Sequence, residues 1–545
     1  MTNFRGADLL VQTLCRAGVT RIFSLSGNQI MPIYDACFAE GIEIIHTRHE
    51  AAAVFMADAH AQLTGEIGVC LVTAGPGASN AIGALFTARH SESPVLLLTG
   101  DSATTQDGRG AFQEMDQVPM TAPVTKLSFR ARAAMDLGTD MARAIRTALS
   151  GRPGPVHVAL PFDLLNADAS GATLPAASAL MRDQCALCPD RVQLLVETLT
   201  MAKRPLILTG PSLSQSRAAG ALADLAKNLA TPVVAMESPR GLRDPSLGQF
   251  AQVFAKADLI VCLGKTVDFT LGFGQPPACD PTARWIVLSP EQAERDRAHL
   301  NLGARLKMAC ATDPRDVLKA LCTTPPRQPD AVPPARENWI AEVADRIAAR
   351  SATPRQPKDE ILPVDICTAV QRQIDATSAE CVLIVDGGEF GQWCQSAITG
   401  DYRLINGPSG AIGGGLCYGI GAKKAMPEAV VIALMGDGTI GFHLGEFETA
   451  LRADTPFVAV IGNDARWNAE HQIQLRDYGA ERLIGCTLSG ARYDLAVAGL
   501  GGHGEYVTDP ADLDAALARA IASGKAACVN VAMTGLPAPS GAPNH

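Results

Sequence analysis

Residues 429–439 carry the sequence Ala-Val-Val-Ile-Ala-Leu-Met-Gly-Asp-Gly-Thr, in which an apolar run ends in a glycine turn. A helical pattern follows at 445–452, and the next apolar run, 456–461, leads into Gly-Asn-Asp. Uninterrupted Val, Ile and Leu runs that alternate with helices are typical of a parallel sheet covered on both faces. One strand–helix–strand crossover returns the chain to the same sheet edge, so we expect Asp437 and Asp464 to lie close together there.

The same alternation continues through the rest of the chain and divides it into three blocks. We expect strands at 21–25, 42–46, 68–73, 94–99 and 155–160 in the first block, at 204–210, 231–236, 258–264 and 285–289 in the second, and at 381–386, 429–435, 456–461 and 527–532 in the third. The sequence therefore predicts an α/β protein with three doubly wound parallel-sheet domains in series. Blocks one and three have similar length and strand density, which allows a duplicated fold.

Two seams separate the blocks. The first is an Ala/Ser-rich passage at 176–189, and the second contains five prolines within 323–336. Proline at that density predicts an extended, semi-rigid linker. We therefore expect the boundaries to fall as follows: domains at 1–175, 190–325 and 361–536, a Pro-rich linker at 326–360 and a loose tail at 537–545.

Composition and charge exclude several classes of protein. The 545 residues include 46 Lys and Arg against 56 Asp and Glu, a net charge of −10. Because nucleic-acid binding needs a basic face, we expect no nucleic-acid partner. No apolar stretch approaches the roughly 20 residues that span a bilayer, and the N-terminus lacks the apolar core of a signal peptide. We therefore expect a cytoplasmic protein without a membrane partner.

The 15 cysteines are scattered. Cys185 and Cys188 have CxxC spacing, but no second pair or nearby histidine completes a zinc site. We expect mostly buried, reduced thiols.

The two strand-end carboxylates, Asp437 and Asp464, predict a magnesium site. Hard oxygen ligands from neighbouring strand ends suit an octahedral Mg²⁺ that also binds phosphate oxygens. The glycine turn at a helix start adds backbone N–H donors for the same phosphates. A Gly-Asp-Gly segment by itself is usually only a turn. A ligand site is favoured here because a second carboxylate, Asp464, follows after one crossover.

Together, Gly436-Asp437-Gly438 and Asn463-Asp464 resemble the magnesium–diphosphate motif of the thiamine-diphosphate-dependent enzymes. The resemblance implies that Asp437, Asp464 and the backbone carbonyl of Arg466 hold the metal. Asp464 stands where asparagine is usual, which keeps an oxygen ligand and adds a negative charge. The resemblance covers nearly the whole chain and implies a pyrimidine-binding, a central and a diphosphate-binding domain, in that order.

The segment Thr47-Arg-His-Glu50-Ala-Ala-Ala follows the strand at 42–46 and opens a helix. A glutamate there favours the helix dipole by about 0.3–1 kcal/mol, which requires no catalytic role. In the family, however, a similar segment carries the glutamate that bonds N1′ of the cofactor's aminopyrimidine. By this resemblance Glu50 favours the imino tautomer, whose N4′ can take the proton from C2 of the thiazolium.

The turns that contain Gly75, Gly388 and Ala411 resemble segments that contact the cofactor in the family. Ile412 stands where methionine is common, and its bulk can hold the cofactor bent. The expected cofactor-binding residues are Gly75, Pro76, Asn80, Gly388, Glu389, Ala411, Ile412, Gly436, Gly438 and Thr439.

Substrate contacts are expected in three places. Phe112 and Gln113 belong to an Ala-Phe-Gln-Glu segment that resembles the acetolactate synthase group, in which Phe and Gln lie beside the substrate. Asn28 and Gln29 stand where acyloin-forming relatives carry a polar residue. Neither titrates near neutral pH, so they can orient a substrate but cannot shuttle a proton alone. Trp467 lies in a stretch similar to one in benzaldehyde lyase. Glu50, Gln113 and Gln29 are the expected catalytic residues.

The sequence of the central domain gives less indication of a ligand. In acetolactate synthases this domain holds FAD, and in oxalyl-CoA decarboxylases it holds ADP. Residues 236–241 and 267–274 lie where a nucleotide could bind, but no G-x-G-x-x-G fingerprint supports a dinucleotide. The resemblance therefore allows FAD without a motif that indicates it, and Arg240 has no assigned role.

The leading functional hypothesis is a carboligase or lyase of the acetolactate synthase type, acting on 2-oxo acids or acyloins. The alternative is a 2-hydroxyacyl-CoA lyase or oxalyl-CoA decarboxylase, although the sequence has no convincing basic cluster for CoA. A non-catalytic paralogue is disfavoured because Glu50 and Asp437 are both present. In the family the cofactor lies between the first domain of one chain and the third domain of its partner. We therefore expect a homodimer or homotetramer with the active site at the subunit interface.

Overall fold

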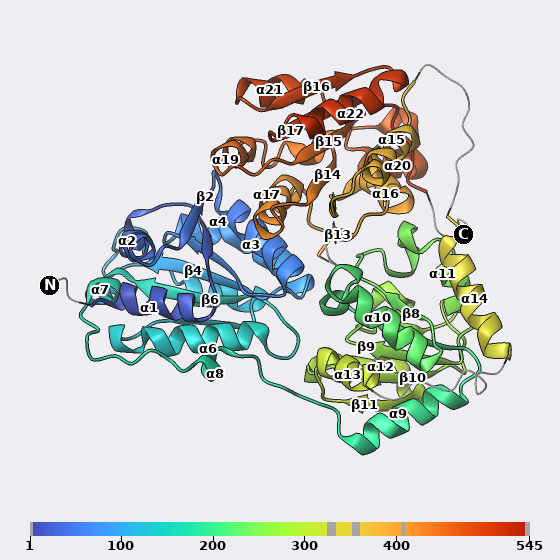
Figure 1. The fold of residues 1–545 in the computed structure, drawn as a ribbon, viewed down its shortest axis with the longest axis horizontal. Coiled ribbons are helices and arrows are strands. Elements are labelled where there is room, and N and C mark those ends of the chain that lie inside the picture. The colour runs from blue at the N-terminus through green and yellow to red at the C-terminus, as the bar shows by residue number, and fades with distance from the viewer. Residues whose placement is uncertain (1–3, 324–333, 351–359, 406–408, 540–545) are drawn as a thin grey trace.

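The computed structural model describes residues 4–323, 334–350, 360–405 and 409–539. It contains three separate sheets, which follow one another along the chain and define an N-terminal, a central and a C-terminal domain (Figure 1). Neighbouring strands pair in parallel in all three sheets. The prediction of three parallel-sheet α/β domains in series is confirmed.

The N-terminal domain is covered by helices on both faces of its sheet. The strands are β1 (Arg21–Ser24), β2 (Glu43–His46), β3 (Gly68–Val72), β4 (Val95–Asp101), β5 (Leu127–Arg130) and β6 (Val156–Pro161), in the order β2-β1-β3-β4-β6-β5. Because both faces are covered, every residue of β3 and β4 is buried. The helices on one face are α1 (Gly6–Arg16), α2 (Met31–Glu40) and α6 (Leu137–Leu149), and those on the other are α3 (Glu50–Thr64) and α4 (Pro76–His90).

The C-terminal domain repeats this arrangement, with the order β13-β12-β14-β15-β17-β16. Counted from the first strand of each domain, the two orders are identical, which supports a duplicated fold. The strands are β12 (Cys381–Val385), β13 (Tyr402–Ile405), β14 (Val430–Gly436), β15 (Val458–Asn463), β16 (His503–Val507) and β17 (Ala527–Ala532). The helices on one face are α15 (Pro363–Ala376), α16 (Gly388–Ala397) and α22 (Leu513–Ala522), and those on the other are α17 (Gly415–Ala425), α19 (Glu446–Arg452) and α21 (Tyr493–Gly499).

The central domain has a smaller sheet in the order β11-β10-β9-β7-β8. Its strands are β7 (Pro205–Thr209), β8 (Val233–Ala235), β9 (Leu259–Leu263), β10 (Arg284–Leu288) and β11 (Leu306–Cys310). The helices on one face are α9 (Pro189–Met201), α10 (Gln215–Leu229) and α13 (Pro314–Cys322), and those on the other are α11 (Phe250–Phe254), α12 (Gln292–Leu302) and α14 (Pro334–Ala348).

The expected Pro-rich linker at 326–360 contains a helix, α14, which differs from the prediction. Trp339 and Val343 of this helix are buried in the core of the central domain, and the Trp339 indole N–H donates to the Pro205 carbonyl over 2.9 Å. The middle of the expected linker is therefore a packed helix. The parts at 324–333 and 351–359 lie outside the described residues.

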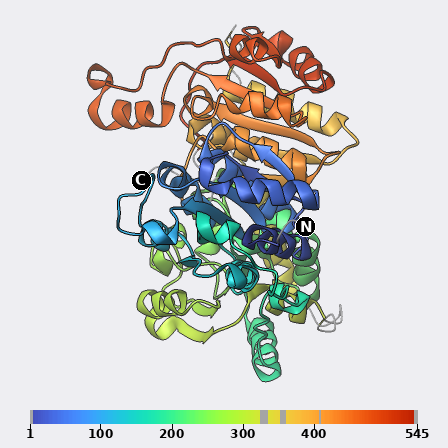
Figure 2. The same ribbon diagram turned by 90° about the vertical axis from the view of Figure 1, so that its left-hand side faces the viewer.

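The N- and C-terminal domains share one hydrophobic core. Helix α3 packs against α17, and one cluster of buried side chains runs from the N-terminal sheet through both helices into the C-terminal sheet. At its centre the Tyr418 hydroxyl donates to the buried Asp58 carboxylate over 2.8 Å. In Figures 1 and 2 the C-terminal domain, coloured orange to red, lies above the other two.

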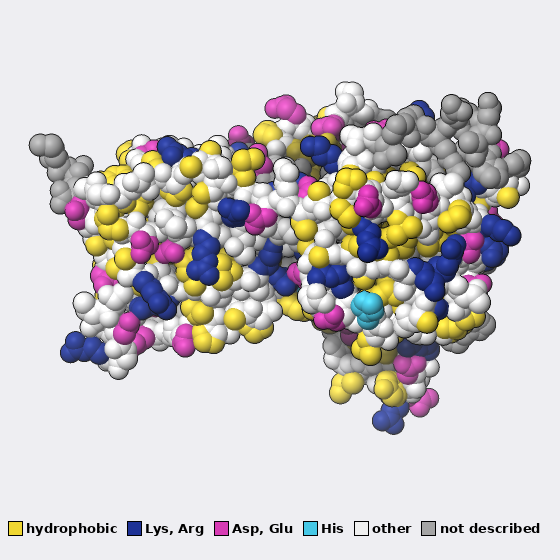
Figure 3. All heavy atoms as spheres, turned by 90° about the horizontal axis from the view of Figure 1, so that it is seen from below, with side chains coloured by type: hydrophobic (Ala, Val, Ile, Leu, Met, Phe, Trp, Pro, Cys, Tyr) yellow, Lys and Arg dark blue, Asp and Glu magenta, His cyan; other side chains and the backbone are white. Residues whose placement is uncertain are grey.

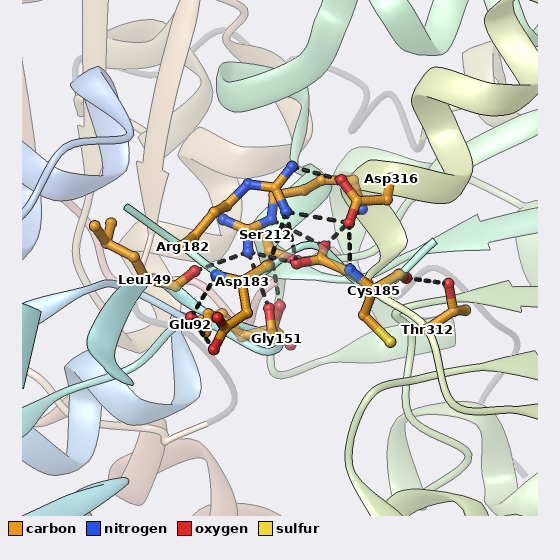
Figure 4. A network of polar contacts seen from close by, with 12 residues as sticks. Glu92, Leu149, Gly151, Arg182, Asp183, Cys185, Ser212, Thr312 and Asp316 are labelled. Atoms are coloured by element: carbon orange, nitrogen blue, oxygen red, sulfur yellow. Dashed lines mark hydrogen bonds and ion pairs between the residues drawn. The ribbon is translucent and has the colours of Figure 1, made fainter. Parts of the chain in front are cut away.

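Polar contacts tie the passage between the first two domains to the central domain (Figure 4). Arg182 forms an ion pair with Asp316 of α13 over 2.5 Å. The Cys185 carbonyl accepts from the Thr312 hydroxyl over 2.7 Å, and its N–H donates to Asp316 over 2.8 Å. These contacts hold the connecting segment against the central domain. The Cys185 and Cys188 side chains are exposed free thiols.

Basic and acidic side chains are interspersed over the face of the molecule shown in Figure 3. The helices of the described residues include none that is both long and apolar enough to cross a membrane.

Candidate active site

The ends of β14 and β15 meet at one edge of the C-terminal sheet. Gly436 pairs with Gly462 in the last register position, so the residues that follow, Asp437 and Asp464, emerge next to each other. Both side chains line a cavity of about 460 Å³. A crevice at the carboxyl ends of parallel strands is where small ligands bind in open α/β sheets.

One oxygen of the buried Asp437 carboxylate lacks a hydrogen-bond partner among the described residues. The residue is 2% exposed, and its Oδ2 accepts no hydrogen bond from the described residues. Burial, followed by the charge of Asp464, raises the pKa of Asp437 to about 7, and burial raises the pKa of Asp464 to about 6. Two adjacent carboxylates with an unsatisfied buried oxygen fit a cation, because a cation compensates both the repulsion and the missing bond.

The turn that carries Asp437 is held on several sides. The Tyr493 hydroxyl donates to the Asp437 carbonyl over 2.9 Å, and the Thr439 hydroxyl donates to the Gly436 carbonyl over 3.0 Å. A side chain at Gly438 would meet the Trp467 ring at 2.6 Å, so this position requires glycine. Trp467 thus packs on the turn itself and lines the same cavity, together with Thr439 and Arg466.

A second loop reaches the cavity through Asp386, at the end of β12. This buried carboxylate accepts backbone N–H groups of Gly413 and Gly415, each over 3.0 Å. Ala411 and Ile412, which the sequence assigned to the cofactor, are thereby brought to the cavity wall. The sequence analysis gave Asp386 no role, because its partners lie on a distant turn.

Gly388 and Glu389 line the same cavity at the start of α16. The Ala538 N–H donates to the Glu389 carboxylate over 2.6 Å. Burial raises the pKa of this carboxyl. The first residues of the expected loose tail at 537–545 therefore contact the site, and residues 540–545 lie outside the described part of the chain.

The remaining predicted residues form a second group, in the N-terminal domain. Glu50 begins α3, is 8% exposed, and accepts a hydrogen bond from the Asn80 side chain over 3.0 Å. A Cβ at Gly77 would lie 3.7 Å from the Glu50 Oε1 and 2.9 Å from the Thr73 side chain. Pro76 is the first residue of α4, which carries Asn80. The turn between β3 and α4 therefore closes directly over the Glu50 carboxylate.

The predicted substrate residues lie around the same turn. The Thr73 hydroxyl donates to the Gln29 side-chain oxygen over 2.6 Å, and Asn28 is the exposed neighbour of Gln29. A Cβ at Gly75 would lie 3.0 Å from the Gln113 carbonyl. Phe112, next to Gln113, is 76% exposed.

The structure thus divides the predicted site residues into two groups. All those after residue 380 line the cavity, which no described residue of the N-terminal domain lines. Sequence analysis missed three residues of the cavity wall that come from the central domain, Pro239, Arg240 and Phe269. Only the general position of their two segments was noted, as a possible nucleotide site. Across the described residues no cluster of three or more His, Cys, Asp or Glu side chains is arranged to hold a metal, so a metal here needs other ligands beside the two carboxylates.

Comparisons with known proteins identify the family of the chain. Residues 4–120, 192–321 and 386–531 match the N-terminal TPP binding domain, the central domain and the C-terminal TPP binding domain of the thiamine pyrophosphate enzymes. A probable acetolactate synthase of Mycobacterium bovis is 31% identical over 533 residues, which cover 96% of this chain and 94% of the relative. The 2-hydroxyacyl-CoA lyase 2 of Homo sapiens is 30% identical over 550 residues, covering 92% of this chain and 84% of the relative. The chain therefore belongs to the thiamine pyrophosphate enzyme family.

Proposed function

We propose that this enzyme is a carboligase or lyase that uses thiamine diphosphate and Mg²⁺ to form or cleave a carbon–carbon bond next to the carbonyl of a 2-oxo acid or acyloin. The observation that carries the proposal is the unsatisfied, buried Asp437 oxygen beside Asp464, at the end of a glycine turn. When bound there, thiamine diphosphate supplies a carbon nucleophile.

The C-terminal group of residues binds and orients the cofactor. The Asp437 and Asp464 carboxylates and the Arg466 carbonyl would supply oxygen ligands for Mg²⁺, which would hold the diphosphate. Ile412 contributes an apolar surface for the cofactor to bend over. These residues anchor the cofactor and take no part in proton transfer.

The N-terminal group provides the acid–base chemistry. Glu50 bonds N1′ of the pyrimidine and holds or releases a proton there, with Asn80 keeping its carboxylate in place. Gln29 and Gln113 orient the substrate oxygens, while Asn28, Phe112 and Trp467 line the substrate space.

A complete site needs both groups, yet no described residue of the N-terminal domain lines the cavity of the same chain. This supports an active site shared by two chains in a homodimer or homotetramer. Mixing Glu50→Gln chains with Asp437→Asn chains tests this arrangement. Each variant alone leaves every site damaged, but a mixed dimer has one site with an intact Glu50 and an intact Asp437. We expect activity to return to about a quarter of wild type after random exchange of subunits in a two-fold dimer.

The readout is turnover after co-refolding or co-expression, with each variant mixed with itself as the control. If each site were built from a single chain, the mixture would stay inactive, and the shared site would be rejected.

The substrate class is tested with a panel of 2-oxo acids, acyloins and acyl-CoA thioesters, scored by product. We expect turnover of 2-oxo acids to exceed turnover of thioesters. Preference for thioesters would favour the alternative, a 2-hydroxyacyl-CoA lyase or an oxalyl-CoA decarboxylase-like enzyme. That alternative is supported by relatives named 2-hydroxyacyl-CoA lyase 2.

FAD in the central domain has less support. A nucleotide phosphate in a doubly wound domain commonly contacts backbone N–H groups in the turn after a strand. After β7 the Ser212 N–H already donates to Glu92 of the N-terminal domain over 2.9 Å (Figure 4). Glu92 is itself paired with Arg152 over 2.8 Å. A flavin absorption band in the purified protein would establish FAD despite these contacts.

A further inference from the structure

The central domain contributes one cation to the cavity of the C-terminal domain. Arg240 lies in the turn after β8, and Phe269 begins the short helix Phe269–Gly274 after β9. Both side chains line the cavity that Asp437 and Asp464 also line. Neither belongs to the cofactor contacts proposed above, so their role needs a separate explanation.

The turn that presents Arg240 has little freedom to move. Gly241 has φ +55°, and a Cβ there would lie 2.1 Å from the Thr270 carbonyl oxygen. The turn therefore packs directly on the backbone of the Phe269–Gly274 helix. The Arg240 N–H also donates to the Ser238 hydroxyl over 3.2 Å. These contacts hold Arg240 and Phe269 side by side.

Thr270 in turn is fixed from inside the central domain. Its N–H donates to Asp268 over 2.9 Å, and its hydroxyl accepts from the Lys265 ammonium group over 2.7 Å. Lys265 is 3% exposed, and the nearby Asp268 carboxylate compensates its charge. A buried network of this kind resists displacement because each lost bond would leave a polar group unsatisfied. The wall formed by Arg240 and Phe269 is thus built on a rigid support.

The guanidinium of Arg240 has no bonded partner within the described chain, although its charge lowers the pKa of Glu389 in the same cavity. Its guanidinium makes no hydrogen bond or ion pair with any residue that the structure describes, and the residue is exposed. Among the carboxylates of the cavity, Asp437 and Asp464 are assigned to the metal, and Glu389 is bonded by the Ala538 N–H, so that Arg240 acts on Glu389 through its charge alone. Arg466, the other cation of the cavity, acts on Asp464, whose pKa its charge lowers. The N–H donors of the Arg240 guanidinium are therefore available to a ligand in the cavity.

We propose that Arg240 binds a negatively charged oxygen group of the substrate while Phe269 contacts the adjoining apolar part. This inference rests on the proposed function, in which the substrate enters the cavity beside the cofactor. A guanidinium suits both a carboxylate and a phosphate, because its parallel N–H groups match two oxygens at once. The group is thus the carboxylate of a 2-oxo acid or a phosphate of a CoA thioester, and the test separates the two.

The test compares Arg240→Gln and Arg240→Lys with wild type in the cofactor-loaded enzyme. For Arg240→Gln we expect KM for charged substrates to rise about ten- to hundredfold, as for the loss of a charge-assisted bond, with kcat changed far less. KM for a neutral aldehyde acceptor should not change. Arg240→Lys should recover part of the loss, because it keeps the charge but not the paired geometry.

Two substrate pairs identify which negatively charged group of the substrate binds Arg240. A 2-oxo acid is compared with the corresponding aldehyde, and an acyl-CoA with the same acyl group on pantetheine, which lacks the phosphates. An effect confined to the first pair assigns Arg240 to the carboxylate, and an effect confined to the second assigns it to a phosphate. Arg243→Gln is the matched control, since Arg243 is an exposed residue of the same turn outside the cavity lining.

A binding measurement separates this inference from the proposed function. Calorimetric titration with oxamate, an unreactive 2-oxo acid analogue, needs no turnover, and we expect Arg240→Gln to weaken its binding about tenfold or more. Two results together would overturn the role of Arg240. Wild type and variant would bind oxamate equally, or neither would bind it, and the KM values of the variant would be unchanged. A wild-type enzyme that binds oxamate through Arg240 but converts no member of the panel would instead overturn the proposed function.

Discussion

Replacing Glu50 with glutamine should lower kcat by about 10²- to 10⁴-fold, the usual contribution of a positioned acid–base group. Glutamine has nearly the same shape, and its side-chain oxygen can still accept the hydrogen bond that the Asn80 amide donates over 3.0 Å. The substitution therefore removes the charge and the titratable proton without opening a cavity. Because Glu50 lies outside the cavity that Asp437 and Asp464 line, the affinity for Mg²⁺ and diphosphate should change much less than kcat.

Steady-state kcat is the primary measurement, and cofactor binding by quenching of tryptophan fluorescence is the second. Glu66→Gln is a suitable control, because Glu66 is an exposed glutamate just beyond the other end of α3. A Glu50→Gln enzyme with wild-type kcat would reject the assignment of Glu50. Loss of folding, detected as a lower Tm, would mark the loss of activity as indirect.

Replacing Asp437 with asparagine should weaken Mg²⁺-dependent cofactor binding by more than about 100-fold. Loss of a residue that merely supports a metal ligand already costs about 10- to 100-fold, and Asp437 is a proposed ligand itself. The same variant should stabilise the protein without cofactor at pH 8, because it removes a buried negative charge, one oxygen of which has no hydrogen-bond partner among the described residues.

The sign of this effect follows from the pKa of Asp437, which burial raises from its ordinary value of 3.8 to about 7 in the folded apoprotein. Below pH 3.8 the group is protonated in both the folded and the unfolded chain and has no net effect on stability. As the pH rises toward 7 the unfolded chain releases its proton first, so the free energy of unfolding falls. The penalty is complete above pH 7, and the asparagine variant lacks it.

Thermal unfolding in the presence of a chelator, at pH 4 and at pH 8, measures this difference. We expect the variant to have a Tm higher than wild type by several degrees at pH 8 and by little at pH 4, since about 1 kcal/mol corresponds to 2–4 °C in domains of this size. Asp454→Asn provides the control, because Asp454 is an exposed aspartate outside the cavity. A variant that is less stable than wild type at pH 8 would contradict the cost assigned to the buried charge of Asp437.

The sequence predicted the interior strands of all three sheets but missed β5, β11, β13 and β16. Each of these four strands lies at an edge of its sheet. Interior strands are buried on both faces and so appear as continuous apolar runs, whereas edge strands are partly exposed and mix polar with apolar residues. The runs of Val, Ile and Leu that make a parallel sheet recognisable are therefore weakest where the sheet ends.

The candidate site was predictable to different degrees. Asp437 and Asp464 follow from the strand pattern, because parallel strands end at a common edge. Glu50 could be assigned only through resemblance, since a glutamate at a helix start is common for reasons of its own. Arg240 and Phe269 could not be assigned, because their place depends on how the central domain packs against the C-terminal domain, and no local pattern records that contact.

The prediction of a Pro-rich linker was wrong for a related reason. The dense prolines of 323–336 favour an extended chain, but proline is also well tolerated at the first position of a helix, and α14 begins at Pro334. The apolar residues that hold α14 in place, Trp339 and Val343, come after the proline-rich stretch.

Helix α14 has a practical consequence for anyone who dissects this protein. The family match to the central domain ends at residue 321, yet Trp339 fills part of that domain's interior and bonds Pro205 at the start of its first strand. A fragment trimmed at the match would expose the apolar surface that α14 covers and would be prone to aggregate. An excised middle domain should therefore extend through residue 349 at least.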